Sequence, residues 1–134
     1  MMRLYLDIDG VLLDRKGQVP EGALDFLHWA TTHFECYWLT THCKGDSSTA
    51  VRYLARHYPA EAMPLLQRVK ATNWDAMKTE GIDFEHPFLW LEDNPFQAEL
   101  VKLKARGWKD SIVIVDLKQP DELGRVRRLI KETL

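Results

Sequence analysis

The sequence predicts an α/β fold, a three-layer, doubly wound (Rossmann-like), mostly parallel sheet of about five strands. Short apolar segments alternate with helical patterns along the chain, which is typical of a parallel sheet covered by helices on both faces. Residues 111–117 (SIVIVDL) are apolar at successive positions, as expected for a strand buried on both faces. The length of 134 residues suits one domain, so a single domain is predicted over residues 1–134.

The predicted strands are short apolar segments that are bounded by turn residues or charges. They span residues 3–9, 34–40, 87–94 and 111–117. The apolar connection at 62–69 is expected to carry one further strand. Residues 10–20 contain the turn signals Gly10, Gly17 and Pro20, and this segment is predicted to form a small hairpin or flap.

The predicted helices follow these strands in turn. They span residues 21–33, 47–58, 71–81, 95–107 and 120–134. Asp46 or Ser47 is expected to cap the second helix, because their side chains accept hydrogen bonds from free backbone N–H groups. Pro95 at the start of the fourth helix and Gly107 at its end are the expected residues for those positions.

The composition limits the classes of partner. The net charge is −2, so nucleic acid remains possible as a partner but is not indicated by charge, and an oligomer is also possible. No apolar run approaches the roughly 20 residues that span a bilayer, and no signal peptide is evident, so no membrane association is expected. Two cysteines make no disulfide framework, which favours a cytoplasmic location.

Carboxylates and a hydroxyl stand at the carboxyl ends of three predicted strands, where ligands bind in open parallel sheets. The residues are Asp7, Asp9, Thr40, Glu92 and Asp93. Converging carboxylates repel one another, and a hard divalent cation relieves the repulsion. Mg²⁺ prefers a few carboxylates together with water and phosphate oxygens. The sequence therefore predicts a Mg²⁺ site that receives a phosphorylated ligand.

Each of these residues suits one task in phosphoryl transfer. Asp7 is expected to act as a nucleophile, because aspartate carboxylates form covalent phospho-enzymes. Asp9 is placed to protonate the leaving oxygen and later to activate water. Thr40 offers a hydroxyl and a backbone N–H to phosphate, and Lys70 offers a positive charge. Gly10 allows the backbone to turn sharply beside the ion.

The same residues resemble the motifs of the haloacid dehalogenase-like superfamily. LYLDIDGVLL at 4–13 is similar to its first motif, an Asp-x-Asp-Gly pattern after an apolar strand, with Asp7 as nucleophile and Asp9 as general acid/base. CYWLT resembles the second motif and implies phosphate binding by Thr40; Thr41 fits the motif less well, because it lies one position later. The third motif of the superfamily is a lysine ahead of the fourth motif. Lys70 is taken as this lysine, and Lys78 is its rival.

FLWLEDN at 88–94 resembles the fourth motif, an acidic pair at a strand end. The resemblance implies that Mg²⁺ is held by Asp7, the backbone carbonyl of Asp9, and Asp93, with Glu92 binding directly or through water. Asn94 is expected to orient a ligand or water, and His42 lies where it could touch the substrate. Gly10 and Thr41 are the other candidate substrate contacts.

The resemblance implies a phosphomonoesterase with an aspartyl-phosphate intermediate and a substrate of unknown identity. The chain has no segment for the cap domain that the superfamily usually adds, so the site is expected to be open and suited to a large substrate such as a nucleic-acid end or a phosphoprotein. Two alternatives remain: a catalytically silent binding protein on the same fold, and a receiver-like phospho-acceptor module.

Overall fold

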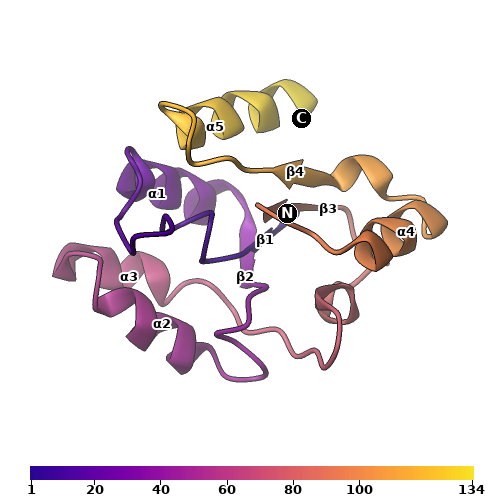
Figure 1. The fold of residues 1–134 in the computed structure, drawn as a ribbon, viewed down its shortest axis with the longest axis horizontal. Helices are drawn as coiled ribbons and strands as arrows, with labels where there is room; N and C mark the ends of the chain where they lie inside the picture. The colour runs from indigo at the N-terminus through magenta and orange to yellow at the C-terminus, as the bar shows by residue number, and fades with distance from the viewer.

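The computed structural model describes residues 1–134 and has an α/β architecture around a four-stranded, all-parallel sheet (Figure 1). The strands are β1 (Arg3–Leu6), β2 (Glu35–Trp38), β3 (Phe88–Glu92) and β4 (Ile112–Ile114). The α-helices are α1 (Ala23–His33), α2 (Ser47–Ala55), α3 (Met63–Leu66), α4 (Gln97–Ala105) and α5 (Glu122–Thr133). Three 3₁₀ turns complete the elements: η1 (Ala60–Ala62), η2 (Lys78–Gly81) and η3 (Lys109–Ser111).

The strand order is β2-β1-β3-β4, so the chain moves first to one side of β1 and then to the other. The predicted Rossmann-like class is confirmed, with four strands in place of about five. Such an order creates a switch point between β1 and β3, where the connections leave in opposite directions and open a crevice beyond the strand ends. That crevice is the expected place for a ligand.

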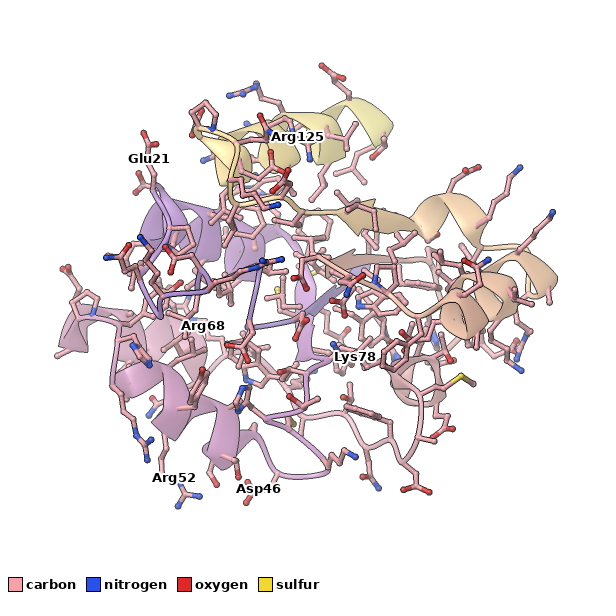
Figure 2. All side chains as sticks on the ribbon, viewed as in Figure 1. Glu21, Asp46, Arg52, Arg68, Lys78 and Arg125 are labelled. Atoms are coloured by element: carbon pink, nitrogen blue, oxygen red, sulfur yellow. The ribbon has the colours of Figure 1, made fainter.

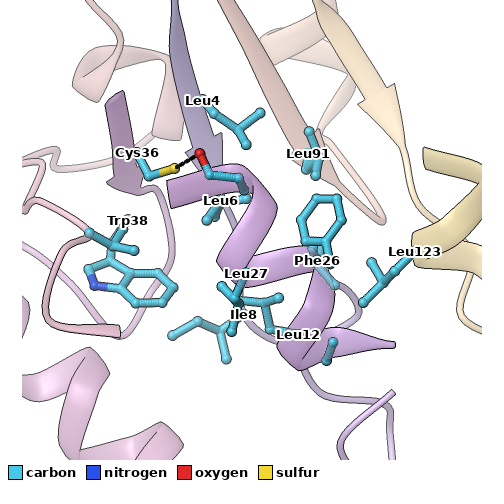
Figure 3. Packing of buried hydrophobic residues seen from close by; sticks show 14 of the residues in the cluster. Leu4, Leu6, Ile8, Leu12, Phe26, Leu27, Cys36, Trp38, Leu91 and Leu123 are labelled. Atoms are coloured by element: carbon cyan, nitrogen blue, oxygen red, sulfur yellow. Dashed lines mark hydrogen bonds between the residues drawn. The ribbon is translucent and has the colours of Figure 1, made fainter. Parts of the chain in front are cut away.

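The two faces of the sheet are buried by different helices, because alternate strand residues point to opposite sides. Leu4 and Leu6 belong to the larger apolar cluster, in which Figure 3 shows them with Phe26 and Leu27 of α1 and Leu123 of α5. Buried residues of α2 and α3 complete this cluster. Tyr5 and Trp90 belong to a smaller cluster on the other face, which Leu103 of α4 covers. Helices thus cover both faces, and polar side chains gather at the strand ends.

Two predicted elements between β2 and β3 are wrong. Residues 62–69 hold the short helix α3 instead of a strand; Pro64 suits its first turn, whereas a proline would interrupt a strand ladder. Residues 71–81 form no α-helix, and only η2 is helical there. The hydroxyl of Thr72 donates to the carbonyl of Trp38, and Gly45 N–H donates to the carbonyl of Thr72. These bonds hold the segment beside the end of β2 in a non-helical path.

Residues 10–20 form a series of turns, not the predicted hairpin. The apolar side chains of Val11, Leu12 and Leu13 are fully buried in the larger cluster, so this part of the segment is core. Asp14 Oδ1 accepts from the N–H groups of Lys16 and Gln18 and fixes the turn that follows.

Asp46 caps α2, because its side chain accepts a hydrogen bond from the backbone N–H of Ser48. Asp46 was one of the two predicted capping residues, and the other was Ser47. Both cysteines are buried and carry free thiols. None of the helices combines the length and the apolar character that crossing a membrane would need.

Candidate active site

Three carboxylates meet at the switch point between β1 and β3. Asp7 directly follows β1, Glu92 is the last residue of β3, and Asp93 comes next. One oxygen from each lies within 4.8 Å of the others. Asp7 and Glu92 are 5% and 2% exposed, whereas Asp93 is open to solvent. The sheet therefore brings together the acids that the sequence predicts at its edge.

Lys78 bridges the two buried carboxylates. Its Nζ lies 3.0 Å from Asp7 Oδ2 and 2.6 Å from Glu92 Oε1. Figure 2 shows Lys78 near the middle of the molecule. The other oxygens are also held: Asp7 Oδ1 accepts from Ile8 N–H, and Glu92 Oε2 accepts from Asp93 and Asn94 N–H. A buried carboxylate needs such partners, since unpaired burial costs several kcal/mol or more.

Burial dominates the titration of these groups. It raises the pKa of Asp7, and the charge of Lys78 only partly offsets the rise. Burial and the nearby Asp7 charge raise the pKa of Glu92. Burial and Glu92 raise the pKa of Asp93 to about 6. Burial alone would lower the pKa of Lys78, but Asp7 and Glu92 outweigh it, so the pKa of the ammonium group is raised.

Glu99, in the first turn of α4, places Lys78 at the site. Its Oε2 accepts from the backbone N–H of Lys78 at 2.8 Å, and its Oε1 accepts from Phe96 N–H at 2.9 Å. One buried carboxylate thus ties η2 to the start of α4. Glu99 was not predicted as a site residue, although an acid three residues into a helix is a known capping position.

Lys70, the predicted phosphate-binding lysine, is not brought to this cluster. Its backbone pairs with β2 beside Tyr37, short of the strand's carboxyl end. Its exposed side chain turns toward the amino end of β2, where Nζ lies 3.0 Å from Glu35 Oε1. The structure thus places the rival lysine, Lys78, at the acidic cluster and leaves Lys70 away from it.

Gly10 is required by the close approach of the Asp93 side chain. Its φ is +86°, a conformation that L side chains rarely adopt, and a Cβ at this position would overlap the Asp93 carboxyl group. The glycine of the first motif therefore makes room for the acid that follows β3. This is a contact between two predicted site residues.

Thr40 and Asp9 lie on the β2 side of the site. Thr40 is buried and directly follows Leu39. The N–H of Leu39 donates to the carbonyl of Leu6, the residue before Asp7, so Thr40 and Asp7 follow neighbouring segments of the chain. The Asp9 side chain is 56% exposed and makes two hydrogen bonds. Its Oδ2 is 2.9 Å from His42 Nε2, and its Oδ1 accepts from the hydroxyl of Tyr53 at 3.0 Å. Tyr53 was not predicted, and no motif in the sequence marks it.

The remaining predicted contacts are exposed. Thr41 and Asn94 are open to solvent, and Asn94 contributes a backbone N–H to Glu92. A groove of about 660 Å³ opens from Gly10 and Asp93 toward the end of β4. Its walls also carry three basic side chains, Arg15, Lys16 and Lys118. The groove gives the site room for a ligand much larger than phosphate.

The acidic cluster fits a small hard cation. All three donors are carboxylate oxygens, the ligand type that Mg²⁺ prefers. In an octahedral site with Mg²⁺–oxygen distances of about 2.1 Å, neighbouring ligands lie about 3 Å apart and opposite ligands about 4.2 Å apart. The three oxygens lie within 4.8 Å of one another, so the side chains would move closer together to surround an ion. Asp93 is the most available ligand, because both oxygens of Glu92 already accept hydrogen bonds.

Comparisons with protein-family models, curated proteins and solved structures gave no match to this chain.

Proposed function

We propose that this chain is a Mg²⁺-dependent phosphomonoesterase of the haloacid dehalogenase type, with Asp7 as nucleophile. The observation that carries the proposal is the arrangement around Asp7. A buried aspartate at the switch point of a parallel sheet faces a lysine, and two further acids lie close by. The first motif supports the same assignment, because Asp7, Asp9 and Gly10 follow the superfamily's pattern.

Asp7 is held in an orientation that leaves little freedom. Ile8 N–H binds one of its oxygens and Lys78 binds the other, so the carboxylate is fixed before a substrate arrives. Preorganised groups lower the barrier, because little rearrangement is needed during the reaction. Lys78 is also placed to attract an entering phosphoryl group, whose oxygens are negatively charged.

The proposed reaction has two steps. An oxygen of Asp7 forms a bond to phosphorus while the ester bond breaks, and Asp9 gives its proton to the leaving oxygen. Asp9 then takes a proton from water as that water attacks phosphorus, which releases phosphate and restores Asp7. Bound Mg²⁺ would supply positive charge that stabilises the phosphoryl oxygens. Thr40 would donate its hydroxyl to one of them.

The groove beside Asp93 supports a substrate with a sizeable organic group. It begins at Gly10 and Asp93, so a phosphomonoester with its phosphorus at Asp7 could extend along it. The groove carries three basic side chains and three acidic ones, so its charges balance and its size is the feature that bears on the substrate: Arg15, Lys16, Lys118, Asp14, Asp93 and Asp116. A groove of this size favours a large substituent, such as a nucleic-acid end or a phosphoprotein, over a small alcohol.

The proposal is tested by phosphate release from a panel of phosphomonoesters with and without Mg²⁺. The panel contains nucleotides, sugar phosphates, phosphopeptides and oligonucleotides with 3′- or 5′-phosphates. Release should require Mg²⁺, and Asp9→Asn should slow it by about 10²–10⁴-fold. If no substrate releases phosphate while Mg²⁺ still binds, the proposal is wrong and a binding role replaces it.

A further inference from the structure

The side chains of His42 and Tyr53 form a stacked pair against Asp9. Their ring centroids are 3.8 Å apart and the ring planes differ by 12°. Each ring contributes one hydrogen bond to a different oxygen of the same carboxylate, at 2.9 Å from His42 and 3.0 Å from Tyr53. The Asp9 carboxylate is therefore held at two points by a flat aromatic unit.

The two rings come from separate elements that are themselves fixed. His42 lies in the loop after β2, and its backbone N–H donates to Thr40 Oγ1 at 3.3 Å. Tyr53 lies on α2, whose residues Ala50 and Leu54 are buried in the larger apolar cluster. The stacked pair thus links the loop after β2, helix α2 and Asp9 through direct contacts.

From this geometry we infer that His42 and Tyr53 are positioning residues that hold Asp9 in its working orientation for proton transfer. The inference rests on the proposed function and adds two residues that the superfamily motifs do not include. Asp9 needs such support, because its side chain is 56% exposed and would otherwise rotate freely. Proton transfer requires a donor within about 2.6–3.2 Å of the leaving oxygen, so lost orientation slows the reaction.

The test compares two substrates that differ in their need for a proton. The nitrophenolate leaving group of p-nitrophenyl phosphate is stable without protonation, whereas the alkoxide of an alkyl phosphate is not. Tyr53→Phe keeps the ring and removes one hydrogen bond to Asp9, and His42→Gln removes the stack. The quantity compared is kcat/KM, because it covers only the steps up to release of the alcohol and leaves out the later attack of water, which both substrates share. Each variant should lower kcat/KM for the alkyl phosphate by about 10-fold or more, and kcat/KM for the aryl phosphate much less.

His57→Gln provides the matched control. His57 lies edge-on to Tyr53, with centroids 5.6 Å apart, and it is exposed and forms no hydrogen bond with Asp9, whose side chain binds His42 and Tyr53. This variant changes the aromatic surroundings while both partners of Asp9 remain. It should leave the ratio of the two rates unchanged. Equal losses on both substrates in Tyr53→Phe and His42→Gln would overturn the inference, because they would indicate a general structural defect.

A second readout needs neither metal nor turnover. The ¹³C chemical shift of the Asp9 carboxyl carbon, measured by NMR in the metal-free protein, should move in Tyr53→Phe and in His42→Gln but not in His57→Gln. Unchanged shifts in the first two variants would overturn the inference. A wild-type chain that releases phosphate from no member of the substrate panel would instead overturn the proposed function, so the two failures are distinguishable.

Discussion

The ammonium group of Lys78 lies 3.0 Å from Asp7 Oδ2, although the two residues are 71 positions apart in the chain. The same nitrogen lies 2.6 Å from Glu92 Oε1, so one cation neutralises two buried carboxylates at the switch point. The stability of the metal-free protein therefore depends on this lysine, and so does the charge at the site.

Replacing Lys78 by Met should destabilise the metal-free protein by about 3–5 kcal/mol, because two buried carboxylates lose their counter-charge. The free energy of unfolding from urea titrations measures the effect. Lys70→Met is the control, since Lys70 is exposed and pairs only with Glu35; its change should be small. Saturating Mg²⁺ should restore part of the stability lost in Lys78→Met. If the two variants have the same free energy of unfolding, the contacts of Lys78 with Asp7 and Glu92 contribute little to stability.

Asp7→Asn should abolish phosphate release and keep the fold. The amide oxygen can still accept from Ile8 N–H, but an amide does not form the phospho-enzyme. The measurement is acid quenching of a ³²P-labelled substrate, followed by counting of protein-bound label. The wild-type chain should carry label and the variant none, with unchanged circular dichroism. Full activity in Asp7→Asn would show that Asp7 is not the nucleophile.

Gly10→Ala should weaken Mg²⁺ binding and destabilise the protein, because the added methyl group displaces the Asp93 carboxyl. Gly22 is the matched control: its φ of +74° resembles the +86° of Gly10, but a Cβ there would meet no atom within 4 Å. Both substitutions should carry the backbone cost of about 1–2 kcal/mol for a left-handed residue. Calorimetric titration with Mg²⁺ should show weaker binding only in Gly10→Ala, and equal affinities would contradict this contact.

The pH dependence follows from the raised pKa of Asp93, about 6. Its pKa in the unfolded chain is near the ordinary value of 3.8, so the folded state binds the proton more tightly. The stability of the metal-free protein should therefore fall as the pH rises from about 4 to about 6. Burial raises the pKa of Asp7 and Glu92 as well, and both add to this trend.

Mg²⁺ binding should show the opposite dependence, because the proton and the metal compete for Asp93. Affinity should increase with pH and level off above about pH 6. Calorimetry at several pH values in wild type and Asp93→Asn provides the comparison. The variant should bind Mg²⁺ more weakly and with a shallower pH slope. An unchanged slope in Asp93→Asn would place the titrating ligand at another residue.

Sequence patterns were sufficient where local chemistry decides the outcome. The strand before Asp7, the helix that Asp46 caps and the buried strand before Glu92 were all predicted, because apolar periodicity and capping are local properties. The convergence of Asp7, Glu92 and Asp93 was also predictable, since parallel strands end at one edge. Residues 62–69 were predicted wrongly because the local effect of Pro64, which favours a helix start over a strand, was not used. Residues 71–81 were predicted wrongly because tertiary hydrogen bonds such as that of Thr72 outweighed a weak helical pattern.

The fold class and the acids at the strand ends can be predicted from the sequence alone, because both follow from patterns within a few residues. In contrast, the contact of Lys78 with Asp7 and that of Tyr53 with Asp9 became known only from the folded chain. These contacts depend on the path of an irregular segment and on the docking of α2 against the core. They join residues that are distant in the chain, and no local spacing encodes such a meeting.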